Sequence, residues 1–152
     1  MDTSVLFQAL YSSSGASHAI LRRIRGGSIR LALSVPVYGE YQDVLNRPDK
    51  RTQLGLSVHD VRAILDFIAF IAVPSPVHFR MRPNLRDESD NIFVELAFAS
   101  GSSYLITQNI RDFTVDADLN LGQLRIVTPS QFMRKWRQTH GNEAQYADHP
   151  RS

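Results

Sequence analysis

Four acidic residues spread along the chain stand where a fold could bring carboxylates together: Asp2, Glu40, Asp90 and Asp112. Asp2 precedes the apolar segment VLFQAL, Glu40 and Asp90 lie on expected helices next to expected strands, and Asp112 comes five residues after an expected strand. In an open parallel α/β sheet, such positions share the carboxyl-terminal edge of the strands. Carboxylates on one edge repel one another unless a cation neutralises them. Oxygen ligands without His or Cys favour Mg²⁺ or Mn²⁺, so the pattern predicts a divalent metal site.

Each acid, taken singly, also has a purely structural interpretation. Glu40 stands on the apolar stripe of its helix, three residues after Val37, where a carboxylate is costly to bury unless it is paired or binds metal. It could instead edge that stripe and reach solvent. Asp90 could serve only as a helix cap, and Asp112 could pair with Arg111 or cap a turn.

Strands and helices are expected to alternate along the chain. We expect helices over residues 17–25, capped by Ser17, over 36–45 and over 91–100. Two more helices should begin at capping boxes, one made by Ser57 and Asp60 and one by Thr128 and Gln131. Strands are expected over 29–34, 71–73, 103–107 and 124–128. This alternation with short connections predicts an α/β sandwich with a mostly parallel sheet. Residues 1–137 are predicted to form one domain, and the polar segment 138–152 a disordered tail.

The composition excludes several classes of protein. A chain of 152 residues is large enough for one domain with its own core. It has 0 Cys, which excludes disulfides and Cys-ligated zinc. No apolar run approaches the roughly 20 residues of a membrane span. With no signal-peptide pattern after Met1, we expect a cytoplasmic protein without membrane contact. The net charge is only +2, and the clustered arginines could be either solvated surface or phosphate-binding groups.

Four segments also match a known family in order: "DTSVLFQALYSSSGAS", "VPVYGEYQDVLNRP", "DESDNIFVELAFASGSSYLITQNIRDF" and "LRIVTPSQF". Together they resemble the PIN-domain proteins, and most closely the toxins of toxin–antitoxin systems related to VapC-type ribonucleases. The resemblance implies a three-layer sandwich with a sheet of order 3-2-1-4-5 and an acidic pocket at its edge. It implies cleavage of single-stranded RNA assisted by Mg²⁺ or Mn²⁺. It further implies a cognate antitoxin protein and a homodimer.

The resemblance assigns roles by position. Asp2, Glu40 and Asp90 match the three most constant acids of the family, which implies that they act in catalysis and hold the metal. Ser4 matches the small polar residue that orients the first acid, and Thr107 matches the residue that ends the fourth strand.

The fourth acidic position departs from the common pattern. Many relatives have Asp where this chain has Asn109, while others share the "N-x-x-D-F" form with Asp112 nearby. We expect Asp112 to complete the catalytic and metal-binding set, with Asn109 in support. Arg86 and Arg111 lie close in sequence to the acids and are candidates to bind the RNA backbone.

The start of the chain departs from the family too. In the family an apolar first strand ends at the first Asp, whereas only Met1 precedes Asp2 here. We therefore expect a truncated first strand, and we interpret it as a start that lies upstream. The alternatives are that another segment fills the gap, or that the chain folds poorly alone.

Two other functions compete with this interpretation. A haloacid-dehalogenase-like phosphatase would have a second Asp two residues after the first, where Ser4 stands. A PIN fold that has lost cleavage and only binds nucleic acid or protein would account for Asn109 and for the short start.

Overall fold

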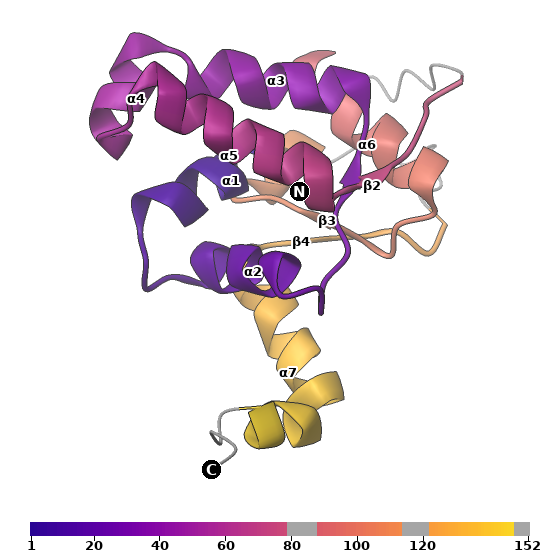
Figure 1. Ribbon diagram of the computed structural model, residues 1–152. Helices are drawn as coiled ribbons and strands as arrows, with labels where there is room; N and C mark the ends of the chain where they lie inside the picture. The colour runs from indigo at the N-terminus through magenta and orange to yellow at the C-terminus, as the bar shows by residue number, and fades with distance from the viewer. Residues whose placement is uncertain (79–87, 114–121, 148–152) are drawn as a thin grey trace.

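Helices make up most of the regular structure in the computed structural model, which describes residues 1–78, 88–113 and 122–147 (Figure 1). In chain order the elements are α1 (Thr3–Tyr11), α2 (Ala16–Arg25), β1 (Ala32–Leu33), α3 (Val35–Leu45), α4 (Pro48–Leu54), α5 (Val58–Ile71), β2 (Val73–Pro74), α6 (Glu88–Ser100), β3 (Tyr104–Ile106), the 3-10 helix η1 (Ile110–Phe113), β4 (Arg125–Val127) and α7 (Pro129–Ala147). None of the helices in these residues is long and apolar enough to cross a membrane.

Side-chain caps explain where several helices begin. The Ser57 hydroxyl accepts the Asp60 N–H at 3.1 Å, and the Asp60 carboxylate accepts the Ser57 N–H at 2.9 Å, so the expected capping box at α5 is confirmed. Thr128 and Gln131 exchange the same pair of bonds, at 3.2 and 3.0 Å, at the start of α7. Ser34 ends β1 and caps α3 by accepting from the Val37 N–H at 3.3 Å.

Two small parallel sheets form the centre of the fold. β1 pairs with β2 in the register Ala32 to Val73, and β3 pairs with β4 in the register Leu105 to Ile126. The parallel α/β class is confirmed. Within the described part of the chain the strands form two pairs, not the one continuous sheet of order 3-2-1-4-5.

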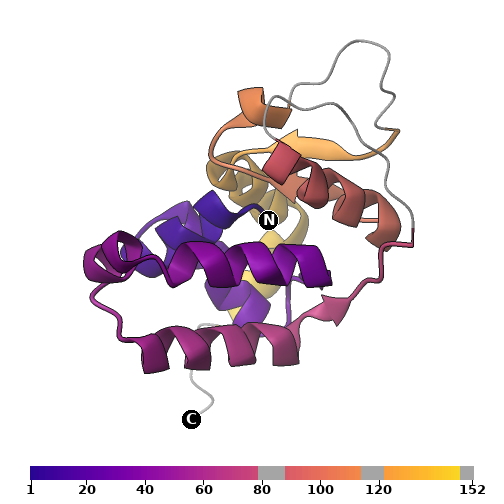
Figure 2. The same cartoon turned by 90° about the horizontal axis from the view of Figure 1, so that it is seen from above.

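Helices cover these strands and connect the two pairs. Figures 1 and 2 show α3 and α5 side by side, and Figure 1 shows α2 and α7 on the opposite side of β3 and β4. α6 packs against both β1 and β3, so it bridges the two sheets. The core between these elements is apolar and includes Val5, Leu6, Ile20, Val37, Tyr41, Leu45, Val61, Ile68, Phe93, Leu105 and Met133.

The predicted cap at Ser17 is wrong. α2 starts at Ala16 with Gly15 in the cap position, and Ser17 lies inside the helix with its side chain buried. Its hydroxyl accepts a hydrogen bond from the Gln108 side-chain amide at 3.0 Å. Ser17 therefore bonds to a residue distant in sequence instead of capping α2.

Helical structure extends further than expected in three places. α4 (Pro48–Leu54) follows closely after α3, in a stretch where no helix was expected. α6 begins at Glu88, ahead of the expected 91. α7 continues to Ala147, so residues 138–147 are helical and the predicted disordered tail is wrong for them, whereas 148–152 lie outside the described residues.

Candidate functional site

Asp2 joins the start of α1 to the end of β3. Its backbone N–H donates to the Ile106 carbonyl at 2.9 Å, and its side chain, 8% exposed, caps α1. One carboxylate oxygen accepts from the Ser4 hydroxyl at 2.6 Å and from the Val5 N–H at 3.2 Å, and the other accepts from the Thr107 hydroxyl. A buried carboxylate is costly unless it is hydrogen-bonded, so these three donors determine where it can lie.

Thr107 holds the other side of this arrangement. It follows β3, its N–H donates to the Val127 carbonyl at 2.9 Å, and its side chain is fully buried. The hydroxyl that donates to Asp2 also accepts from the Asn109 N–H at 3.1 Å. The loop after β3 is therefore tied to Asp2 by a hydroxyl that is used both as donor and as acceptor.

Ser4 completes the connection from the helix side. It lies in the first turn of α1, and its hydroxyl, besides donating to Asp2, accepts from the Gln108 N–H at 3.4 Å. Ser4 and Thr107 thus both contact Asp2 directly, while their support of catalysis stays a prediction.

A chain of buried aromatic rings connects the segments that carry the predicted acids. The Tyr41 hydroxyl donates to the Met1 carbonyl at 2.5 Å, and its ring lies 6.4 Å from the Phe93 ring between centroids. Phe93 lies 6.5 Å from Phe113 in an edge-to-face arrangement. The start of the chain, α3, α6 and η1 therefore meet around one apolar cluster.

Every predicted acid is close in sequence to a member of that cluster. Met1 precedes Asp2, Tyr41 follows Glu40, and Phe113 follows Asp112. Asp90 lies three residues before Phe93, which places both on the same side of α6. Glu40 and Asp90 are half-buried, and Asp112 is exposed. The fold brings together the segments that carry all four acids.

Tyr41 stays protonated at neutral pH. Burial, and then the negative charge of Asp2, raise the pKa of the Tyr41 hydroxyl far above its usual range. It is therefore a permanent hydrogen-bond donor to Met1 and not a candidate base. Sequence reasoning placed Tyr41 only on the buried stripe of its helix, and no sequence signal indicated that it ties α3 to the start of the chain.

Carboxylate oxygens, the chemical groups of the four predicted acids, are suitable ligands for a hard divalent ion. The described side chains do not surround such an ion. Of roughly four lone pairs on a carboxylate, three of Asp2 accept hydrogen bonds, which leaves one oxygen position for a metal. Within residues 1–78, 88–113 and 122–147, no three acidic or histidine side chains come close enough to hold a common ion. Metal binding by Asp2, Glu40, Asp90 and Asp112 stays a prediction.

Positive charge near this edge comes from Arg111. It is exposed on η1, next to the equally exposed Asp112, and Asn109 is exposed one turn earlier. Arg86 lies outside the described residues. Arg25 ends α2, about 12 Å along the helix axis from Ser17, so that arginine lies away from the edge where Ser17 meets Gln108.

A family model described as PIN domain matches residues 1–111. This range covers most of the chain and includes Asp2, Ser4, Glu40, Asp90 and Thr107. No curated protein and no solved structure matches the chain.

Replacing Thr107 by Val tests the hydrogen bonds at Asp2. The substitution keeps the shape but removes the donor to the buried carboxylate and the acceptor of the Asn109 N–H. We expect the free energy of unfolding to fall by about 1–3 kcal/mol, measured by urea denaturation with an unchanged m-value.

The matched control is Thr139→Val, because Thr139 is exposed and its hydroxyl donates only to the Lys135 carbonyl within α7. It should change stability by no more than about 0.5 kcal/mol. Equal effects of the two substitutions would show that the contact with Asp2 contributes nothing specific.

Proposed function

The chain belongs to the PIN domain family, and on that premise we propose that it is an endoribonuclease that hydrolyses phosphodiester bonds of single-stranded RNA with Mg²⁺ or Mn²⁺. Family membership indicates a nuclease-type function. The choice of RNA and the metal dependence are our proposal, supported by the match of Asp2, Glu40 and Asp90 to the acids of the family.

One structural observation carries this proposal. The buried cluster of Tyr41, Phe93 and Phe113 connects the four segments that bear the predicted acids, while Ser4 and Thr107 hold Asp2 in place. A structural role alone would not require that acids so far apart in sequence come from segments that meet at one edge. A cation site requires in addition that the side chains of these acids converge, which the proposal expects when the ion binds.

Each part of the site has a distinct role in the proposed reaction. Asp2 offers its remaining oxygen position, and Glu40 and Asp90 would supply the further oxygen ligands, with Asp112 or Asn109 at the exposed rim. A divalent ion held by these residues would supply an activated water and would neutralise charge on the phosphate oxygens. Arg111 is exposed next to Asp112 and would bind a phosphate of the RNA backbone near the bond to be cleaved.

Cleavage of a labelled single-stranded RNA by the purified protein tests the activity. We expect hydrolysis in Mg²⁺ or Mn²⁺ that stops on addition of EDTA. Asp2→Asn and Asp90→Asn should each lower the rate by more than about 100-fold, since even outer-shell substitutions at metal sites cost 10–100-fold. Asp43→Asn, on the exposed face of α3, is the control and should leave the rate unchanged.

Two outcomes would contradict the proposal in different ways. RNA binding without cleavage by the wild-type protein would identify a PIN domain that only binds nucleic acid, as Asn109 in place of a fourth acid would allow. Cleavage that survives Asp90→Asn would identify a contaminating nuclease.

We propose further that the protein is a VapC-like toxin that forms a homodimer and is neutralised by a small antitoxin protein. An exposed apolar surface supports an interface with protein: Phe70 is 87% and Phe67 40% exposed, on the same side of α5. An antitoxin would block the acidic edge with a cationic side chain.

Light scattering after gel filtration tests these partners. We expect a dimer for the wild-type chain, a monomer for Phe70→Asp and an unchanged dimer for the control Tyr11→Asp, which alters an exposed aromatic residue on α1. The product of a small neighbouring gene should bind the dimer and suppress RNA cleavage. A wild-type monomer refutes the homodimer, and undiminished cleavage in the presence of that product refutes the antitoxin role.

A further inference from the structure

A groove runs along α7 where that helix packs against the start of α2. Its volume is about 510 Å³, and its lining consists of Ala16 from α2 and, from α7, Ser130, Met133, Arg134, Arg137 and Gln138. The residues from α7 recur at intervals of three or four, so they share one side of the helix. Met133 is buried, whereas both arginines are exposed. The groove is therefore open to solvent and carries positive charge.

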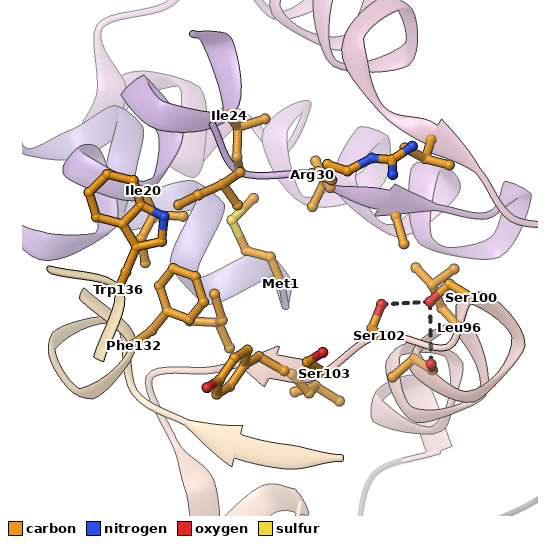
Figure 3. Close-up of a pocket in the computed structure, with 18 of the residues that line it drawn as sticks. Met1, Ile20, Ile24, Arg30, Leu96, Ser100, Ser102, Ser103, Phe132 and Trp136 are labelled. Carbon is orange, nitrogen blue, oxygen red and sulfur yellow. Dashed lines mark hydrogen bonds between the residues drawn. The ribbon is translucent and has the colours of Figure 1, made fainter. Parts of the chain in front are cut away.

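Packing on the opposite side of α7 determines which of its residues face the groove. Phe132 and Trp136, four residues apart, line an apolar pocket together with Ile20 and Ile24 of α2 (Figure 3). At 3.6 residues per turn, the two arginines of the groove lie roughly opposite these two aromatic residues around the helix. Since the aromatic side packs on the core, the arginines are left on the side that solvent reaches.

No acidic residue accompanies these arginines in sequence. Residues 3–39, which include α1 and α2, and residues 122–142, which include most of α7, contain no Asp or Glu. Neither Arg134 nor Arg137 forms an ion pair with a side chain that the structure describes. Arginine presents a planar fork of donors that matches the geometry of a phosphate group. The groove therefore offers two guanidinium groups to an anionic ligand.

On the side of α2, the groove adjoins the edge that carries Asp2. Ser17, which follows Ala16, accepts from the Gln108 side-chain amide at 3.0 Å, and the Gln108 N–H donates to the Ser4 hydroxyl at 3.4 Å. Ser4 in turn donates to the Asp2 carboxylate at 2.6 Å. A short series of hydrogen bonds thus connects the start of α2 to the first predicted acid.

α7 starts at the same edge. The Val127 carbonyl accepts from the Thr107 N–H at 2.9 Å, and α7 begins two residues later, at Pro129. At 1.5 Å per residue, Arg134 and Arg137 lie about 8 and about 12 Å along the helix axis from Pro129. These distances place the arginines outside the predicted acidic site, where phosphates further along a bound strand would pass.

We propose that the groove between α2 and α7 binds backbone phosphates of the single-stranded RNA on one side of the bond to be cleaved. Arg134 and Arg137 form charge-assisted hydrogen bonds to these phosphates, and Ser130 and Gln138 add neutral donors. Contacts of this kind position a strand without reading its sequence. The choice of RNA as the ligand rests on the proposed endoribonuclease function, whereas the shape and charge of the groove are independent of it.

Binding of a labelled single-stranded RNA in EDTA tests the groove without requiring cleavage. Fluorescence anisotropy at a series of salt concentrations gives both the Kd and the slope of log K against log salt. We expect Arg134→Gln/Arg137→Gln to raise the Kd at least about fivefold at 0.1 M salt. The slope should become less steep by about 0.7 for each arginine removed, since each phosphate contact on a single strand contributes about that much.

Two further variants separate phosphate binding from other effects. Arg22→Gln/Arg25→Gln removes the same charge from exposed positions in the last turn of α2 and should leave the Kd within about twofold of the wild-type value, because salt screens distant charges. Arg134→Lys/Arg137→Lys keeps the charge of the groove but loses the fork of donors. It should restore the wild-type slope while the Kd stays above the wild-type value.

Three results would overturn the proposal. Equal weakening by the groove variant and the Arg22/Arg25 variant shows that only net charge attracts RNA. An unchanged Kd in the groove variant, or no RNA binding by the wild-type protein, shows that the groove is not a binding site. A slope that lysine does not restore shows that the arginines do not act through phosphate charge.

The same measurements distinguish failure of the groove from failure of the proposed function. RNA cleavage in Mg²⁺ with unchanged RNA binding in Arg134→Gln/Arg137→Gln refutes the groove alone. RNA binding that depends on these two arginines, without cleavage in Mg²⁺ or Mn²⁺, refutes the nuclease alone and supports the groove.

Discussion

Burial of the Asp2 carboxylate is the constraint on which the rest of this structure depends. A carboxylate removed from water must be hydrogen-bonded, and Asp2 meets that requirement with Ser4 and Val5 from α1 and Thr107 from the end of β3. These donors come from opposite ends of the region that matches the family. The hydrogen bonds to the Asp2 carboxylate therefore join the start of the chain to the end of β3. The same bonds engage both carboxylate oxygens of Asp2.

The aromatic cluster extends that constraint to the other acids. Tyr41 bonds to the carbonyl of Met1, and Phe93 packs between Tyr41 and Phe113. The segments that carry Glu40, Asp90 and Asp112 therefore adjoin the same apolar cluster as the start of the chain. Within the described residues no three acidic or histidine side chains lie close enough to hold a common ion, so the shared metal site stays a prediction.

Much of the local structure could be predicted from the sequence, because local interactions determine it. The capping boxes at Ser57 and Thr128 use residues three apart, and both form. Ser17 was misassigned because its partner, Gln108, is distant in sequence. The helical part of 138–147 was missed because a polar segment without periodicity carries no signal that distinguishes a helix from a tail. The candidate acids and their supporting hydroxyls followed from the family resemblance, whereas the tie from Tyr41 to Met1 depends on tertiary packing alone.

The central claim is that Asp2, Glu40 and Asp90 form one site for a divalent ion. Titration with Mn²⁺, followed by paramagnetic broadening of the backbone amide NMR signals, tests it most directly. We predict that broadening begins at sub-stoichiometric Mn²⁺ and centres on Val5, Tyr41, Asn91 and Thr107, and that it is lost in Asp2→Asn. Broadening centred on another group, such as Asp60 and Asp66 of α5, or none at stoichiometric Mn²⁺, would contradict the account.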